Sequence, residues 1–303
     1  MNAVRVLLAS WNGGQWLQPQ VESILAQQGV NIRLLIGDDC SKDGSAECVT
    51  TALNDDRIEV VTFSEPSGGA GQNFIRTLVG AELTDVDYVA FADQDDIWHA
   101  DKMLRAVSAL KISTACGYSS SVIAFWPDGK EKILEQNPVT TDLDFLFEGA
   151  GQGCTFVLAG PFARQVQQLL RNRAVDISNV HYHDWLIYAI SRSLGKQWFF
   201  DAQPSMRYRQ HDGNDTGARG ALAGVKKRLG LIRNGWYAKQ VQHMLFVSRA
   251  LNPTVIPADF LAAWERERGF KRRIKLGSIL FKRGRRRSSD RLVLTLAAAM
   301  GWI

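Results

Sequence analysis

The sequence predicts an α/β protein in which a mainly parallel sheet is flanked by helices. Over the first hundred residues, short apolar runs alternate with segments of helical periodicity, a pattern typical of parallel sheets covered on both faces. Three of these runs end in polar clusters, at residues 10–12, 38–39 and 93–96. Because the carboxyl ends of parallel strands meet at one edge of a sheet, where ligands bind, we expect these clusters to form one site.

The expected strands are apolar or alternating runs bounded by turn residues. They cover residues 4–9, 32–36, 57–63, 86–92, 121–125, 155–158 and 198–201. The expected helices have apolar residues three or four positions apart. They cover residues 17–25, 45–53, 73–83, 101–111, 162–170 and 185–193, and beyond about residue 222 we expect helices with apolar and basic faces.

Composition and cysteine spacing exclude several classes of protein. With 303 residues and 46% hydrophobic residues, the chain can bury a large core, which excludes a disulfide-stapled miniprotein and a disordered chain. The four cysteines lack CxxC spacing and nearby histidines, so neither a zinc site nor a disulfide framework is expected. The N-terminus lacks signal-peptide features, and the apolar stretch 292–303 is too short to span a bilayer.

Charge is distributed unevenly along the chain. Residues 266–291 contain 12 Lys and Arg against Glu267 and Asp290, whereas the remaining residues hold 24 basic and 29 acidic side chains. No nucleic-acid recognition motif accompanies this basic segment, so no nucleic-acid partner is expected. Its mixture of apolar and basic residues suits an amphipathic helix on an anionic membrane, with a solvated helical face as the alternative. The apolar residues of this expected helix are Phe270, Ile274, Ile279, Leu280 and Phe281.

Two acidic clusters follow expected strands. Asp93, Asp95 and Asp96 offer the oxygen ligands that Mg²⁺ or Mn²⁺ prefers, and a cation held by few carboxylates keeps positions open for phosphates. A solvated turn that caps the next helix is the alternative interpretation. At Asp38 and Asp39, a carboxylate would accept hydrogen bonds from a nucleobase or ribose, or would only form an Asx turn.

A third acidic residue, Asp184, stands at the start of an expected helix. It would act as a general base if it faces the site, and it would also serve as a helix cap. His181 and His183 are two residues apart and lack a third close ligand, which argues against a metal site there. The glycines within residues 68–71 match neither a P-loop nor a dinucleotide-binding fingerprint, which argues against a P-loop kinase and a Rossmann dehydrogenase.

In their order and spacing, these segments resemble the family 2 inverting glycosyltransferases of the GT-A fold, over about residues 4–217. The resemblance is carried by VLLASWNG at 6–13, DDCSKDG at 38–44, FADQDDIW at 91–98 and HDW at 183–185. The DQDDIW and HDW forms, followed by RQH at 209–211, look most like the bacterial rhamnosyltransferase branch that builds lipopolysaccharide, including O-antigen, and other surface polysaccharides.

The resemblance implies a metal-dependent inverting transfer of a sugar, with Mg²⁺ or Mn²⁺ as cofactor. It further implies L-rhamnose from dTDP-L-rhamnose as the sugar and a hydroxyl of a lipopolysaccharide or other surface-polysaccharide glycan as the acceptor. The implied roles are Asp184 as catalytic base, Asp93, Asp95 and His211 as metal ligands and Arg209 as a phosphate contact. Nucleotide-sugar binding is implied for Ala9, Trp11, Asp38, Asp39, Asn73, Asp93 and Gln94, and an acceptor-side position for Gly153, Cys154, Thr155 and Trp185.

Two positions depart from the family pattern. Most relatives have a hydroxyl residue and a tyrosine where this chain has Ala9 and Trp11. The contact at Ala9 is therefore expected to come from the backbone alone, while the Trp11 ring can still stack.

The resemblance also divides the chain. It implies a glycosyltransferase domain at 1–216, with a nucleotide-sugar half at 1–100 and an acceptor half at 101–216, followed by a helical basic extension at 217–303. The expected location is cytoplasmic, peripheral on the inner face of the cytoplasmic membrane. A sugar nucleotidyltransferase and a catalytically silent membrane-docked scaffold stay open as alternatives, whereas a glycosidase needs two opposed carboxylates but no nucleotide pocket.

Overall fold

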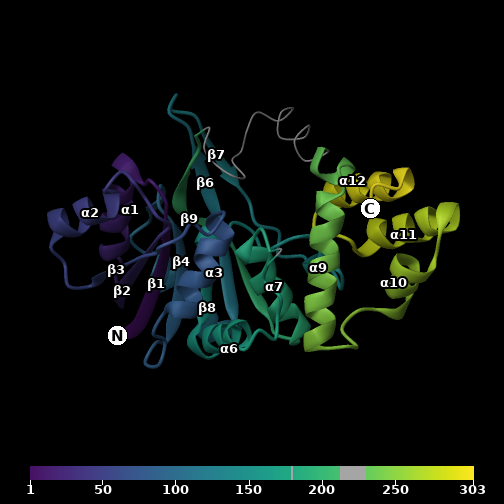
Figure 1. The fold of residues 1–303 in the computed structure, drawn as a ribbon, viewed down its shortest axis with the longest axis horizontal. Helices are drawn as coiled ribbons and strands as arrows, with labels where there is room; N and C mark the ends of the chain where they lie inside the picture. The colour runs from purple at the N-terminus through teal and green to yellow at the C-terminus, as the bar shows by residue number, and fades with distance from the viewer. Residues whose placement is uncertain (179, 212–229) are drawn as a thin grey trace.

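The computed structural model describes residues 1–178, 180–211 and 230–303. These residues form one nine-stranded sheet with helices packed on its faces and a group of helices at the C-terminal side (Figure 1). The α/β class expected from the alternating pattern is confirmed.

The sheet has the strand order β3-β2-β1-β4-β8-β6-β9-β5, and β7 pairs with β6. The first four strands in this order are parallel, and the sheet becomes mixed where β8 pairs antiparallel with both β4 and β6. The strands are β1 Asn2–Ser10, β2 Val30–Asp38, β3 Ile58–Thr62, β4 Tyr88–Asp93, β5 Ile97–Trp98, β6 Gly117–Phe125, β7 Glu131–Leu134, β8 Val157–Ala159 and β9 Trp198–Arg209.

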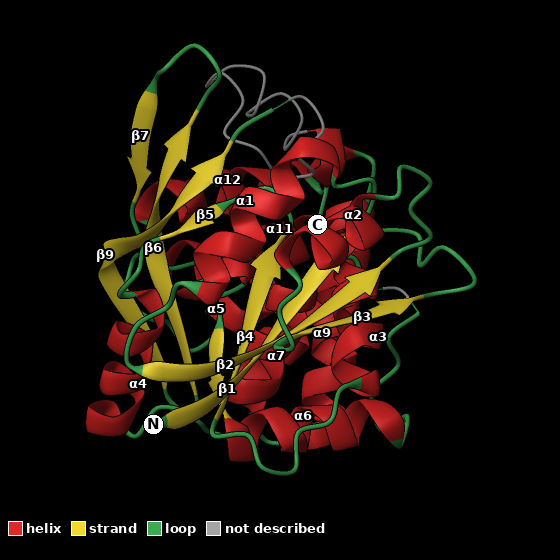
Figure 2. Ribbon diagram, turned by 90° about the vertical axis from the view of Figure 1, so that its left-hand side faces the viewer, coloured by secondary structure: helices red, strands yellow, loops and turns green. Residues whose placement is uncertain are grey.

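Helices lie against the sheet, as Figure 2 shows. Their apolar residues face inward and form the core. In α1, Leu17, Val21 and Ile24 are buried at the spacing that predicted the helix. The helices are α1 Gly14–Leu25, α2 Ser45–Leu53, α3 Ala70–Gly80, α4 Lys102–Ser113, α5 Asp144–Phe147, α6 Gly160–Arg171, α7 His183–Ser193, α9 Trp236–Leu251, α10 Ala258–Leu261, α11 Gly269–Arg283 and α12 Ser288–Met300. A 3₁₀ turn at Gly153–Thr155 and a π-helical turn at Ala262–Arg266 complete the set.

The largest departure from the expected elements is β9. It was expected to end at residue 201 but continues to Arg209, because it pairs with β6 along its length and with β5 near its end. The register shifts where Ser121 is paired with Pro204, an irregularity that admits a proline to the strand. This extension brings residues 207–211 to the edge of the sheet where β4 ends.

The C-terminal helices share a hydrophobic core with one face of the sheet. The same cluster of buried residues contains Phe91 of β4, Trp185 of α7, Met244 of α9 and Leu280 of α11. The expected division between residues 216 and 217 lies outside the described residues. Among the residues that the structure describes, no helix is long and apolar enough to cross a membrane.

One expectation about the basic segment is wrong. Ile279 and Leu280 were expected on the membrane-facing stripe of the amphipathic helix, but both are buried. They lie on the side of α11 that joins the common core. Phe270, Ile274 and Phe281 are exposed, as expected.

Candidate active site

The three acidic and polar clusters meet at the carboxyl edge of the parallel strands. Ser10 at the end of β1 pairs with Asp38 at the end of β2, and Ala9 pairs with Asp93 at the end of β4. The convergence that the sequence predicted is therefore present.

Asp39 has a buried carboxylate held by two residues from the α3 side. The Ser67 backbone N–H donates to Asp39 Oδ1 at 2.7 Å, and the Ser67 hydroxyl donates to Oδ2 at 2.5 Å. The guanidinium of Arg76 forms an ion pair with the same carboxylate and stacks over the Phe63 ring. Sequence reasoning missed Ser67 and Arg76, because neither stands in a motif and both reach Asp39 from about 30 residues away.

Asp38 and Asn73 hold the ends of the strands together. Asp38 accepts hydrogen bonds from the backbone N–H of Ser41 at 3.1 Å and from its hydroxyl at 2.5 Å, which is the turn alternative considered from the sequence. The Asn73 amide donates to the carbonyl of Gly37 at 2.8 Å and to that of Ser10 at 3.4 Å. Both side chains are buried, so they fix the shape of the edge.

Trp11 and Gln94 join the first and third clusters. The Trp11 backbone N–H donates to Gln94 Oε1 at 2.7 Å, and Gln94 Nε2 donates to the Trp11 carbonyl at 3.1 Å. The Trp11 side chain is 61% exposed, whereas Ala9 is buried. This leaves the indole ring of Trp11 accessible for stacking on a flat ligand.

Residues at the end of β9 hold the acidic loop in place. Nε2 of His211 lies 2.6 Å from Asp95 Oδ2, and the His211 ring stacks on Trp16 at 4.4 Å between centroids. Arg209 donates its Nε–H to the Asp95 carbonyl at 2.8 Å and its backbone N–H to Asp96 Oδ1 at 3.0 Å. Asp95 therefore lies beside Arg209 and His211, which follow it by 114 and 116 residues.

Negative charge accumulates among these carboxylates. Burial, together with the charges of Asp95 and Asp184, raises the pKa of Asp93 to about 7. Burial and the charges of Asp95 and Asp93 raise the pKa of Asp96 well above its ordinary value. The Oδ2 atom of Asp96 is buried and has no hydrogen-bond partner among the described residues. The cluster thus lacks full compensation of its charge.

A buried lysine lies beneath the acidic loop. Nζ of Lys102 donates to the Cys154 carbonyl at 2.8 Å and lies 3.6 Å from the centre of the Trp98 ring. Burial lowers the pKa of Lys102 to about 7. No pattern in the sequence predicted that Lys102 is buried, because a lysine in the first turn of an amphipathic helix is ordinarily a surface residue.

The donor set fits a hard divalent cation. Ligand atoms of Asp93, Asp96 and Cys154 lie within 4.8 Å of one another. Burial raises the pKa of the Cys154 thiol well above its ordinary value, which keeps the sulfur protonated and a poor ligand. Carboxylate oxygens are the ligands that Mg²⁺ prefers. Of the predicted ligands, this group contains Asp93 alone, whereas Asp95 and His211 pair with each other.

Asp184 lies in the first turn of α7, where two glycines make room for it. A Cβ on Gly149 would lie 3.4 Å from Asp184 Cγ, and one on Gly153 would lie 2.5 Å from the His183 ring. Asp184 Oδ1 accepts the backbone N–H of Trp185 at 2.7 Å. Burial raises the pKa of Asp184 to about 6, which suits a residue that takes up a proton near neutral pH.

The residues predicted for the acceptor side are mostly buried behind the site. Cys154, Thr155 and Trp185 are all buried, and the Trp185 indole donates to the Phe145 carbonyl at 3.0 Å. Of the four, Gly153 alone is partly exposed. These residues therefore shape the backbone around Asp184.

The histidine pair before α7 does not form a metal site. His183 is buried against the rings of Phe74 and Phe91, with centroids at 4.1 and 5.4 Å. Burial lowers the pKa of His183 to about 3, so the ring is neutral. His181 is exposed and packs edge-on to Trp236.

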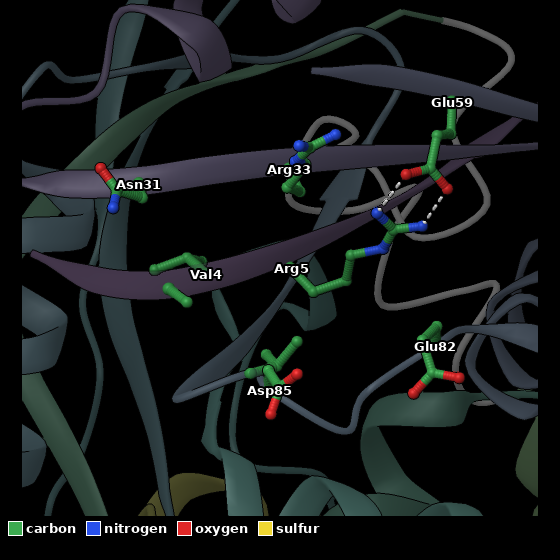
Figure 3. Close-up of a pocket in the computed structure, with 9 residues that line it drawn as sticks. Val4, Arg5, Asn31, Arg33, Glu59, Glu82 and Asp85 are labelled. Atoms are coloured by element: carbon green, nitrogen blue, oxygen red, sulfur yellow. Dashed lines mark hydrogen bonds and ion pairs between the residues drawn. The ribbon is translucent and has the colours of Figure 1, made fainter. Parts of the chain in front are cut away.

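A pocket of about 390 Å³ lies away from this edge, at the amino ends of the strands (Figure 3). It is crossed by the pair of Arg5 and Glu59, with N–O distances of 2.9 and 2.6 Å. None of the predicted site residues lines this pocket.

Sequence comparisons connect the chain with sugar transferases. The model of the family "Glycosyl transferase family 2" matches residues 6–158. The dTDP-rhamnosyl transferase RfbG of Shigella flexneri is 36% identical over 236 residues, which cover 77% of this chain and 82% of RfbG. The putative teichuronic acid biosynthesis glycosyltransferase TuaG of Bacillus subtilis is 32% identical over 117 residues, 38% of this chain and 44% of TuaG.

Solved structures share the fold. S. aureus TarS 1–349 in complex with UDP-GlcNAc has a TM-score of 0.53 and 14% identity, covering 99% of this chain and 89% of TarS. The mannosyltransferase PcManGT from Pyrobaculum calidifontis, in complex with GDP-Man and Mn²⁺, has a TM-score of 0.52 and 15% identity, covering 98% of this chain and 86% of PcManGT.

Proposed function

Because the chain belongs to glycosyl transferase family 2, we propose that it transfers L-rhamnose from dTDP-L-rhamnose to a hydroxyl of a bacterial surface polysaccharide. The donor is proposed from the 36% identity to RfbG, a dTDP-rhamnosyl transferase. Family membership makes the chain a glycosyltransferase with the GT-A fold. The nucleotidyltransferase and the silent scaffold are therefore set aside.

One observation carries the proposed mechanism. A Cβ on Gly153 would lie 3.1 Å from Asp184 Cβ, and the next residue, Cys154, has its sulfur within 4.8 Å of carboxylate oxygens of Asp93 and Asp96. A base for the acceptor hydroxyl and carboxylates suited to the diphosphate side thus lie on the two sides of residues 153–154. This arrangement suits displacement at an anomeric carbon.

The chain's own residues have distinct roles in this reaction. Asp39, held by Ser67 and Arg76, accepts a hydrogen bond from the nucleobase, and the exposed ring of Trp11 stacks on the nucleotide. Asp184 takes the proton of the acceptor hydroxyl as its oxygen attacks the anomeric carbon. The bond from that carbon to the diphosphate oxygen breaks on the opposite face, so the configuration inverts. General-base assistance of this kind contributes about 10²–10⁴-fold.

We also propose that Asp93 and Asp95, with His211 beside them, hold Mg²⁺ or Mn²⁺. When bound, such a cation neutralises negative charge on the departing diphosphate. Arg209 fixes the loop that carries Asp95 and Asp96, and we assign it to the phosphate side of the site. Burial and, after it, the charge of Asp95 raise the pKa of Asp93, and a bound cation would relieve both effects, which supports a cation at this position.

The proposed acceptor is a lipopolysaccharide O-antigen intermediate or another lipid-linked glycan. Such an acceptor is anchored in a membrane, so we propose that the protein works in the cytoplasm, at the inner face of the cytoplasmic membrane. Gly153 and the buried residues beside it, Cys154, Thr155 and Trp185, form the wall on the acceptor side of Asp184 in this proposal.

A nucleotide-binding and transfer experiment tests the proposal. Thermal unfolding is measured with dTDP, UDP, GDP and CDP, each with and without Mg²⁺ or Mn²⁺. A ligand at about 100 times its dissociation constant adds about 2.7 kcal/mol to the free energy of unfolding. We expect the largest metal-dependent shift with dTDP, and a rhamnosylated product of inverted configuration by NMR after incubation with dTDP-L-rhamnose and a lipid-linked acceptor. A shift with UDP alone would contradict the proposed donor.

The matched variants are Asp184→Asn and Asp176→Asn. Asp176 is an exposed carboxylate in the loop before α7, bound to Ser178. Asp184→Asn should lose transfer and keep the dTDP shift, and Asp176→Asn should keep both. Loss of transfer in both variants would contradict the role of Asp184 as base.

A further inference from the structure

Helices α11 and α12 form an antiparallel hairpin on the outside of the molecule. The guanidinium of Arg291 donates to the Lys282 carbonyl at 2.8 Å, and the Thr295 hydroxyl donates to the Gly277 carbonyl at 3.4 Å. The inner side of the hairpin buries Leu280 and Leu294 in the common core. The hairpin therefore has a fixed outer side.

That outer side is rich in large apolar side chains. Phe270, Ile274 and Phe281 recur at one angular position of α11, and three apolar residues recur along α12. They are between 45% and 76% exposed, although side chains of this kind are ordinarily buried. The inner side of the hairpin is filled by the core. The exposed apolar residues of α11 and those of α12 therefore lie on its outer side, on either side of the line where the two helices meet. The outer face comprises Phe270, Ile274, Phe281, Leu292, Leu296 and Met300.

Positive charge borders this outer face. Helix α11 carries six Lys and Arg and no acidic residue. Lys271 is largely exposed and lies 3.5 Å from Glu267. Arg273 and Lys282 are exposed and form no ion pair with any carboxylate that the structure describes. An apolar stripe edged by cations matches the boundary between the headgroups and acyl chains of an anionic bilayer.

We propose that the outer face of the α11–α12 hairpin docks on an anionic lipid bilayer, with its apolar residues in the headgroup region and its cations at lipid phosphates. The proposal deepens the membrane location given above and rests on it for the acceptor, but not for lipid binding itself. A second copy of the chain fits less well, because a symmetric pairing of this face would oppose like charges.

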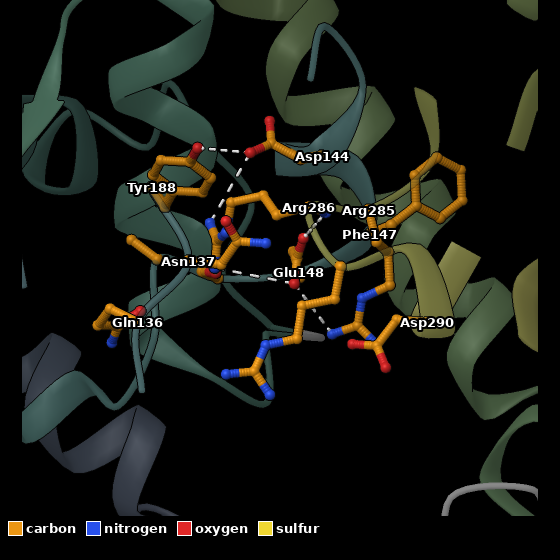
Figure 4. A network of polar contacts seen from close by, with 12 residues as sticks. Gln136, Asn137, Asp144, Phe147, Glu148, Tyr188, Arg285, Arg286 and Asp290 are labelled. Atoms are coloured by element: carbon orange, nitrogen blue, oxygen red, sulfur yellow. Dashed lines mark hydrogen bonds and ion pairs between the residues drawn. The ribbon is translucent and has the colours of Figure 1, made fainter. Parts of the chain in front are cut away.

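The hairpin is tied to the loop beside Asp184, so that docking fixes the site relative to the membrane. The Arg286 backbone N–H donates to Glu148 Oε1 at 2.5 Å (Figure 4). Arg286 Nη2 donates to the Gly149 carbonyl at 2.8 Å. Arg285 lies 3.3 Å from the same Glu148. Gly149 in turn packs against the first turn of α7, next to Asp184.

Vesicle co-sedimentation of the full chain tests the proposal. The probes are vesicles of phosphatidylcholine alone and vesicles that also contain phosphatidylglycerol. We expect binding to the anionic vesicles that weakens with salt, and a loss of about tenfold or more in the triple variant Ile274→Ser, Phe281→Ser, Leu296→Ser. The double variant Arg273→Gln, Lys282→Gln should bind the anionic vesicles more weakly than the unaltered chain does, and its binding to vesicles of phosphatidylcholine alone should be unchanged.

The matched control is Phe246→Ser. Phe246 is an exposed residue of α9 and does not belong to the hairpin, and its variant should bind vesicles like the unaltered chain. Equal sedimentation of the triple variant and the unaltered chain would overturn the proposal. So would a dimer, detected by analytical ultracentrifugation, that the triple variant abolishes.

A second readout separates this proposal from the proposed function. Transfer to a water-soluble acceptor analogue should be equal in the triple variant and the unaltered chain, because the substituted residues lie outside the site. Vesicle binding without any transfer would reject the proposed function and leave this proposal standing.

Discussion

Charged side chains are arranged differently at the two ends of the parallel strands. At the amino ends, Arg5 and Glu59 neutralise each other in a two-point pair across the pocket of Figure 3. At the carboxyl ends, Asp93 and Asp96 have raised pKa values because burial and neighbouring carboxylates oppose their ionisation. The same strands thus carry one edge where charge is compensated and one where negative charge is compensated only in part.

This difference indicates that the carboxyl edge lowers the stability of the fold. Gathering like charges out of water costs free energy, and a pair such as that of Arg5 and Glu59 avoids the cost. The carboxyl edge instead retains Asp93 and Asp96, with an unpartnered Asp96 Oδ2 among the described residues. Substitutions at the two edges should therefore have opposite consequences for activity and stability.

The largest effect is expected for Asp184→Asn. The amide cannot accept the acceptor's proton, so the transfer rate should fall by about 10²–10⁴-fold. Affinity for dTDP should be unchanged, because Asp184 belongs to α7, whereas Trp11 and Asp39, which we propose to bind the base, follow the ends of β1 and β2. Initial rates and nucleotide titrations check this. The amino-edge variant Asp85→Asn is the control, and equal loss in both variants would contradict the comparison.

The second largest effect on the proposed function is expected when the divalent cation is removed. With EDTA, or in Asp95→Asn, the stabilisation of about 2.7 kcal/mol expected from nucleotide at about 100 times its dissociation constant should be largely lost. The reason is that the carboxylates and the diphosphate then repel each other. Calorimetric unfolding with and without Mg²⁺ measures the effect. An undiminished nucleotide shift in EDTA would contradict cation binding at Asp93 and Asp95.

The pH dependence should reflect the base. The pKa of Asp184 is raised to about 6, so the carboxylate that accepts a proton is present above that pH and is lost below it. The kcat/KM for transfer should fall about tenfold per pH unit below about pH 6. Rates from pH 4.5 to 8, with folding checked by circular dichroism, measure this. A flat profile down to pH 5 would contradict the role of Asp184.

Local patterns in the sequence predicted the carboxylates of this site, but not the side chains that contact them. Apolar runs ending in polar clusters predicted the convergence of Asp39 and Asp93, because parallel strands leave little choice of edge. Nothing local predicted Arg76 beside Asp39 or Lys102 beneath the acidic loop, since those contacts depend on how helices pack on the sheet. The burial of Leu280 was missed for the same reason.

At the carboxyl edge, where negative charge is compensated only in part, removing the charge of Asp93 should stabilise the fold. Asp93 has a folded pKa raised to about 7, so its contribution is unfavourable once the pH rises above the unfolded value near 4 and grows until about pH 7. At pH 8 without divalent cations, Asp93→Asn should raise the free energy of unfolding by up to about 4 kcal/mol, the equivalent of a three-unit difference in pKa. Urea unfolding at pH 5 and 8 measures this, and a gain at pH 5 exceeding that at pH 8 would contradict the cause.

The smallest effect belongs to the compensated edge. Glu59 is about half exposed, so water screens its side of the pair, although the Arg5 side chain is buried. The amide oxygen of Gln can still accept one of the two hydrogen bonds from Arg5. Glu59→Gln should lower the free energy of unfolding by no more than about 1 kcal/mol and leave the transfer rate unchanged, because no site residue contacts this pocket. Urea unfolding and initial rates measured on one preparation check both parts. A lower transfer rate at unchanged stability would mean that the two edges are coupled, and that charge at the amino ends also serves the reaction.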